Sequence, residues 1–257
     1  MRSRFLLAAR AALVFGFTFV AAAPPARAAD DAAATKAAAV GSAAELLPPT
    51  TLLYVEMRRP ADVIRLILDH PLRKRLEQSP DYQKAFDTPK FKEFQAVVEA
   101  VEKRSGVEWR KALETTTGGG LVVAVDAATQ GLVVLARSTD EKTTASVRDA
   151  LFSLARDDAQ SKGNPDPVES IDYRGFTAHK AGESIIATAG PWLVVSNKPD
   201  LSKAVADIIL DGGVTLARDD AFAAARKLAP SAKPSGAADS GTAWAFVRMD
   251  PVRLMHA

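Results

Sequence analysis

The 257-residue sequence predicts an α+β protein with antiparallel sheets and helices packed on one face. Two observations predict it. Short apolar runs rich in β-branched residues come in pairs joined by brief Gly-containing turns, a pattern typical of hairpins. Amphipathic helical stretches follow several of these pairs, which predicts repeated strand–strand–helix units. Strict alternation of single strands and helices, as in a doubly wound nucleotide-binding fold, is not indicated.

The expected elements follow from apolar periodicity and from turn residues. The expected strands are residues 52–55, 121–125, 132–135, 176–180, 184–188, 192–195 and 244–247. Helices are expected after Pro60, over 71–112 with interruptions at Pro80 and Pro89, over 147–154 and after Pro199. A Pro presets φ at a helix start, and a nearby Asp satisfies free N–H groups there.

The first of these helices has one apolar face. Its members lie three or four positions apart, which places them on one side of a helix: Val63, Ile64, Ile67 and Leu68. We expect this face to be buried against the sheet.

Residues 1–28 have the layout of a secretory signal peptide. Basic residues up to Arg10 precede an apolar run over residues 11–23, and small residues end the segment at Ala28. The run is shorter than the about 20 residues that a membrane span needs. We expect cleavage after Ala28 and a periplasmic or secreted product. The alternative is an uncleaved anchor, and only then do we expect contact with a membrane.

Composition and charge argue against several functional classes. The chain has 33 Lys+Arg and 31 Asp+Glu; residues 1–28 hold four of these arginines and no acid, so the remainder has 29 against 31 and a net charge of −2. We expect no nucleic-acid partner, because backbone binding needs a clustered cationic surface. The chain contains no cysteine, which excludes disulfides, thiolate metal sites and cysteine nucleophiles.

The remaining chain divides by composition. Residues 29–45 are Ala-rich and predict a disordered tether. Residues 46–257 predict the α+β domain, with a possible sub-division at the polar stretch 157–170 and a polar loop at 230–242. Few residues follow the last expected strand, so we expect either a C-terminally truncated relative of a longer protein or a strand and turn that cap the sheet.

The three histidines do not form a metal-binding or catalytic pattern. His70 follows Asp69 at a helix end, where a cation suits exposed carbonyls, and neighbouring residues on a helix do not face each other. His179 alternates along a strand, and His256 is almost terminal. None has a metal-ligand spacing, so we expect no metal site and no cofactor.

Other candidate motifs favour structural roles. Gly118, Gly119 and Gly120 enter a strand and are not followed by Lys-Ser/Thr, which favours a turn over a phosphate loop. The basic cluster of Arg73, Lys74 and Arg75 favours a solvated helix face. The tryptophans Trp109, Trp192 and Trp244 are isolated, which favours core or rim positions over a sugar-stacking platform.

Two acidic pairs are candidate catalytic carboxylates. Asp157 and Asp158 follow a helix and are predicted to lie in a solvated loop, whereas Asp219 and Asp220 are predicted to start a helix. The paired carboxylates of glycoside hydrolases are brought together in space rather than in sequence, so the pattern alone leaves this chemistry open.

Several segments carry a family likeness. They are Leu46-Leu47-Pro48-Pro49-Thr50-Thr51-Leu52-Leu53-Tyr54-Val55, Arg59-Pro60-Ala61-Asp62, Asp69-His70-Pro71-Leu72 and Gly190-Pro191-Trp192-Leu193-Val194-Val195-Ser196-Asn197. With these segments, residues 46–257 resemble exported bacterial proteins that carry a domain of unknown function. The resemblance implies no activity and no site residues. Members of that group run longer, in agreement with the abrupt end here.

We therefore expect an exported, non-catalytic protein that binds or organises another component of the cell envelope, a protein or a polymer. One alternative is a hydrolase that acts on an envelope polymer through spatially assembled carboxylates. Another is a sensor or inhibitor module that uses an exposed strand edge. A cleft with two acids roughly 5–10 Å apart would favour the hydrolase, and an apolar patch or open sheet edge would favour binding.

Overall fold

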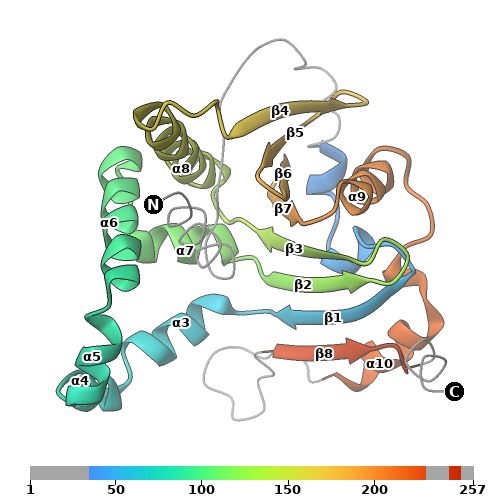
Figure 1. The fold of residues 1–257 in the computed structure, drawn as a ribbon. Helices are drawn as coiled ribbons and strands as arrows, with labels where there is room; N and C mark the ends of the chain where they lie inside the picture. Colours follow the sequence, from blue (N-terminus) through green and yellow to red (C-terminus); the bar gives the residue numbers. More distant parts are fainter. Residues whose placement is uncertain (1–34, 230–242, 250–257) are drawn as a thin grey trace, which may run out of the picture.

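Eight strands form one antiparallel sheet in the computed structural model, which describes residues 35–229 and 243–249 (Figure 1). The strands are β1 (Thr51–Met57), β2 (Leu121–Asp126), β3 (Gly131–Arg137), β4 (Val168–Tyr173), β5 (Phe176–Ala181), β6 (Ser184–Ala189), β7 (Trp192–Ser196) and β8 (Ala243–Val247). Their order across the sheet is β4-β5-β6-β7-β3-β2-β1-β8. The predicted α+β class and antiparallel sheet are confirmed.

Two four-stranded halves meet at the centre of the sheet. Strands β4 to β7 form a meander, and β3 pairs with β7 through the register Val134↔Val195. Strand β1 lies between β2 and β8, so the last described strand closes on the first. In Figure 1, β1, β2, β3 and β8 are seen along their length and β6 and β7 almost end-on, because the sheet is strongly twisted.

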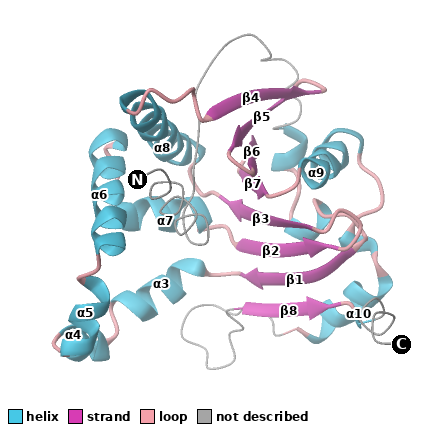
Figure 2. Cartoon of the chain, viewed as in Figure 1, coloured by secondary structure: helices cyan, strands magenta, loops and turns pink. Residues whose placement is uncertain are grey.

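The helices connect and cover these strands (Figure 2). They are α3 (Pro60–Leu68), α4 (Pro71–Glu77), α5 (Pro80–Phe86), α6 (Pro89–Ser105), α7 (Trp109–Thr117), α8 (Glu141–Ser161), α9 (Pro199–Asp211) and α10 (Asp220–Leu228). The predicted interruptions at Pro80 and Pro89 are both helix starts: the preceding Ser79 and Thr88 side chains accept hydrogen bonds from Tyr82 N (3.2 Å) and Phe91 N (3.3 Å).

Helices lie on both faces of the sheet rather than on one. Successive strand residues point to opposite faces, and Val194 belongs to the main core with α9, whereas Leu193 packs with Phe152 of α8 in a second core. Helices α6 and α7 pack in turn against α8 around Val101 and Val147. The sequence pattern missed this because β3, β6 and β7 are apolar on both faces.

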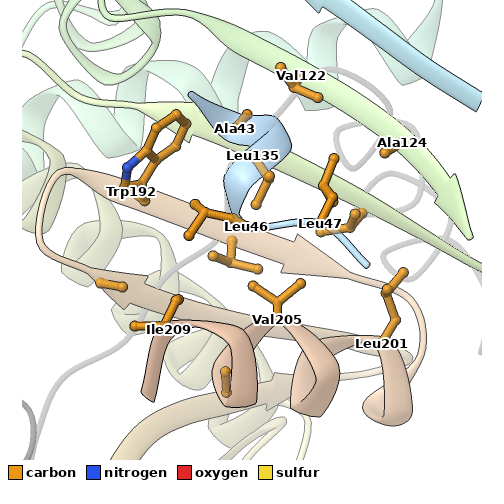
Figure 3. Close-up of a cluster of buried hydrophobic side chains, with 14 of the residues drawn as sticks. Ala43, Leu46, Leu47, Val122, Ala124, Leu135, Trp192, Leu201, Val205 and Ile209 are labelled. Carbon is orange, nitrogen blue, oxygen red and sulfur yellow. The ribbon is translucent and has the colours of Figure 1, made fainter. Parts of the chain in front are cut away.

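The N-terminal part of the described chain is embedded in the main core, contrary to the predicted tether over residues 29–45. Ala37, Ala43 and Ala44 are 0–3% exposed, and the Ser42 side chain caps η1 (Ala43–Glu45). In Figure 3, Leu46 and Leu47 lie between Leu135 of β3 and Val205 of α9. Alanine-rich sequence was interpreted as having little to bury, but small side chains let this segment approach the sheet closely. Residues 29–34 lie outside the described part.

The predicted strand–strand–helix repeat is not confirmed. Five helices, α3 to α7, separate β1 from β2, and four consecutive strands, β4 to β7, come directly before α9. The polar stretch 157–170 does not mark a sub-division in the sheet: it completes α8, forms a short connection and begins β4, and both sides belong to the same sheet.

The apolar face predicted for the first helix is only partly covered. Helix α3 packs mainly against α7, and Ile67 is 64% exposed. No helix within the described residues has the length and apolar character needed to cross a membrane. The predicted signal peptide (1–28), the loop 230–242 and the residues from 250 onward lie outside the described part of the chain.

Candidate apolar binding site

A pocket lies between α9 and the β4–β7 half of the sheet. Side chains from each of these strands line one wall and α9 lines the other: Ile171, Tyr173, Phe176, Ala178, Ile185, Ala187 and Val194 from the sheet, and Pro199, Ser202, Lys203, Val205, Ala206 and Ile209 from the helix. We call this the α9 pocket.

The spacing of residues in the sequence explains why these side chains line the two walls of the pocket. Residues two apart on a strand share a face, so Ile185 and Ala187 of β6 point to the same side as Val194 of β7. Residues 202, 205, 206 and 209 share one face of α9 for the corresponding reason. Alanine at 178, 187 and 206 leaves space that a larger side chain would fill.

The pocket is large enough for a ligand. The volume of the pocket that water can enter is about 90 Å³. The empty space that includes the open mouth is about 590 Å³. The smaller figure, set against the roughly 150 Å³ of a cavity known to accept benzene, leaves room for a small apolar group. The apolar lining offers water few hydrogen-bond partners, which favours an apolar group over water in the buried part of the pocket.

One end of the pocket opens to solvent at the start of α9. Pro199 and Lys203 are exposed, whereas Val205, Ala206 and Ile209 farther along the helix are buried or nearly so. Ser202 lies at the open end. Its Oγ is buried, and it has no hydrogen-bond partner among the described residues.

A polar cluster of Tyr173, Arg174, Asp207 and Asp211 holds the other end of α9 to the β4–β5 turn. The Tyr173 ring lines the pocket, and its hydroxyl donates to Asp207 at 3.2 Å. Arg174 donates to Asp207 at 2.6 Å and to Asp211 at 2.7 and 3.0 Å. We call these four residues the α9 clamp.

The clamp shifts the titration of its members. Hydrogen bonding by Arg174 lowers the pKa of Asp211. Desolvation, followed by its hydrogen bond to Asp207, raises the pKa of Tyr173. Both clamp carboxylates therefore face the same guanidinium, which suits a structural tie and not proton transfer.

Another polar cluster, centred on the half-buried Glu56, lies at the β1–β8 edge. The Glu56 carboxylate is 13% exposed and accepts hydrogen bonds from Arg58 (3.2 Å), Arg226 and Trp244 Nε1. Burial raises the pKa of Glu56, but the hydrogen bonds from Arg226 and Trp244 outweigh it, and the net shift is downward. Glu56 thus ties α10 and β8 to β1.

The described histidines do not converge. His70 lies between α3 and α4, and its Nδ1 accepts a hydrogen bond from Leu72 N at 3.2 Å. The expected role at a helix C-terminus is therefore corrected: the imidazole caps the start of the next helix. His179 lies on β5 with its ring edge-to-face with Phe152, centroids 6.0 Å apart. His256 lies outside the described residues.

The acidic pairs also have separate structural roles. Asp157 and Asp158 lie within α8, not in a loop, and pair with Arg104 (2.7 Å) and Lys162 (2.5 Å). Asp219 caps α10 by accepting from Phe222 N at 2.8 Å, as the predicted helix start requires. Neither pair lines the α9 pocket.

The remaining sequence candidates occupy surface, turn or core positions. Arg73 pairs with Glu77 at 2.6 Å along α4. Gly118, Gly119 and Gly120 form the turn between α7 and β2, where a Cβ on Gly119 would lie 2.8 Å from Arg137 Cγ. Trp192 is buried and Trp244 half-buried, whereas Trp109 is exposed at the start of α7.

No group of three or more His, Asp or Glu side chains that could hold a metal occurs within the described residues. The α9 pocket is lined by no carboxylate.

Comparison with known proteins provides no family assignment. No family model and no curated protein matches the chain. Among solved structures, crystal form I of a protein designated TP0453 aligns with a TM-score of 0.39 and 11% identity, over 82% of this chain and 64% of that chain. Crystal forms IV and III align with a TM-score of 0.32 each, over 65% of this chain and 52% and 51% of theirs. Likenesses this remote assign neither family nor function.

Proposed function

We propose that this chain is an exported, non-catalytic protein of the cell envelope that binds another envelope component by taking up an apolar group in the α9 pocket. The observation that carries the proposal is the pocket itself: an apolar space between a sheet and one helix, open at one end. The export segment predicted over residues 1–28 supports the location.

The hydrolase hypothesis gains no support from the described residues. It predicts two carboxylates that converge in a cleft. The pocket lining has none, and the two clamp acids are bound by one arginine instead of facing a substrate space.

The proposal is tested with three eight-carbon ligands that differ only in the head group: 1-octanol, octanoate and octylammonium. At a ligand concentration of 100 Kd, binding to the folded state adds about 2.7 kcal/mol, which raises Tm by roughly 5–10 °C for a domain of this size. At least one ligand of the series should stabilise the protein.

Two variants place the effect in the pocket. Ala206→Leu fills the space beneath α9 and should abolish the stabilisation, whereas Ala204→Leu, on the same helix but not in the lining, should preserve it. If Ala206→Leu does not fold, Ala187→Val fills the opposite wall. The proposal is wrong if no ligand of the series binds, or if the pocket-filling variant binds as well as its control.

A further inference from the structure

We propose that the ligand of the α9 pocket is a single alkyl chain with an uncharged, hydrogen-bonding head group, and that Ser202 recognises this head group. The inference rests on the proposed function, since it names the chemical class that the same pocket takes.

The shape and lining of the pocket fit one unbranched chain. The buried part is walled by aliphatic and aromatic side chains such as Ile185, Val205 and Ile209. The buried volume of the pocket, about 90 Å³, is smaller than the roughly 150 Å³ of a cavity known to accept benzene. The end of a single chain fits such a space, and a multi-ring ligand does not.

Among the polar residues of the pocket wall, Ser202 has a buried hydroxyl without a partner in the described structure. A buried hydroxyl without a partner is unfavourable, and a ligand oxygen or N–H would remove the penalty. Since Ser202 lies beside exposed Lys203 at the open end, a head group bound there stays near solvent while the chain extends toward Ile209.

The charges around the pocket argue against an ionic head group. Lys203 pairs with Asp200 at 3.6 Å, and Arg174 is bound by both clamp acids. A carboxylate or phosphate would have to compete with Asp200 for Lys203, and no carboxylate lines the pocket to bind an ammonium. A hydroxyl, amide or ester needs no counter-charge, so an uncharged head group suits the open end of the pocket.

The ligand series tests the inference separately from the proposed function. Calorimetry on the purified protein should give a lower Kd for 1-octanol than for octanoate or octylammonium, by tenfold or more. Octanoate or octylammonium binding as tightly as 1-octanol would overturn the inference while the proposed function stands. Binding of none would overturn both.

Ser202→Ala tests the recognising residue. The loss of one neutral hydrogen bond should weaken 1-octanol about three- to tenfold, whereas the Kd of n-octane, which has no head group, should stay the same. The free variant should melt no lower than the wild type, because an unpartnered hydroxyl has been removed. Ser161→Ala, a matched change at the end of α8, should alter neither Kd. An unchanged ratio of alcohol to alkane affinity in Ser202→Ala would overturn the role of Ser202.

Discussion

Arg174 in the β4–β5 turn holds Asp211, the last residue of α9, through hydrogen bonds of 2.7 and 3.0 Å. These residues are far apart in sequence, and the pair fixes one end of the helix that covers the α9 pocket. Arg174 has a positive φ of 56°, and Gly175 follows at 77°, which directs the arginine side chain from a tight turn. The pocket wall is therefore held by a surface contact outside the pocket.

Arg174→Ala should loosen the end of α9. Without the guanidinium, Asp207 and Asp211 repel each other across one helical turn, so backbone amides in the last turn should exchange hydrogen faster than in the wild type. Hydrogen exchange read by mass spectrometry measures this. Arg104→Ala removes a comparable pair between α6 and α8 and should leave α9 unchanged. Equal protection of α9 in wild type and Arg174→Ala would show that the clamp does not hold the helix.

The Arg174–Asp211 pair should stabilise the fold only above acidic pH. Hydrogen bonding by Arg174 lowers the pKa of Asp211 in the folded state. The pair therefore contributes fully above the unfolded pKa, near 4, and its contribution is lost as pH falls through the folded value. Tm of the wild type should exceed that of Asp211→Asn at pH 7, and the gap should narrow toward pH 2.5. A gap of constant size across this range would contradict the ionic contribution.

Glu56→Gln should destabilise the β1–β8 edge. The change removes a half-buried negative charge, so Arg226 and Arg58 lose their ionic partner. We expect the free energy of unfolding to fall by about 2 kcal/mol. Urea denaturation measures this. Glu169→Gln changes an exposed acid on β4 that lies 3.8 Å from Lys180, so its effect should stay below about 0.5 kcal/mol. If the two variants unfold at the same urea concentration, the Glu56 network does not stabilise the edge.

Leu46→Ala should destabilise the main core. Leu46 is 0% exposed, within the segment that lies against β3 and α9, and burial losses of this kind cost about 3 kcal/mol. The matched control, Leu66→Ala, changes a side chain that is 65% exposed on α3 and should cost less than about 0.5 kcal/mol. Urea midpoints of the two variants should separate clearly; coincident midpoints would show that the N-terminal segment adds nothing to the core.

The sequence predicted most strands because their turns are marked. Gly131 and the 118–120 glycines border β2 and β3, and Gly190-Pro191 joins β6 to β7, so periodicity and turn chemistry agree there. Strand β4 was missed. It is an edge strand with only Val168 fully buried, so its apolar signal is weak, and the polar residues that start it were interpreted as a loop.

The α9 pocket could not be predicted, because its lining comes from four strands and one helix and its volume is what their side chains leave unfilled. A helix was predicted after Pro199, and its apolar face includes Leu201, Val205 and Ile209, but such a face is usual for a core helix. One signal was present in the sequence. Ser202 lies three or four positions before Val205 and Ala206, so a polar residue interrupts the apolar face of the helix. A polar residue within an apolar stripe marks a position that needs a partner.

The place of β1 between β2 and β8 sets the order in which the chain can fold. Glu56 of β1 and Trp244 of β8 are 188 residues apart, and Tyr54 finds its aromatic neighbours, Phe222 and Trp244, only in the last part of the chain. Closure between such distant segments is slow. Strand β1 can pair with β2 early, but its other edge stays open until residues 243–247 have been synthesised.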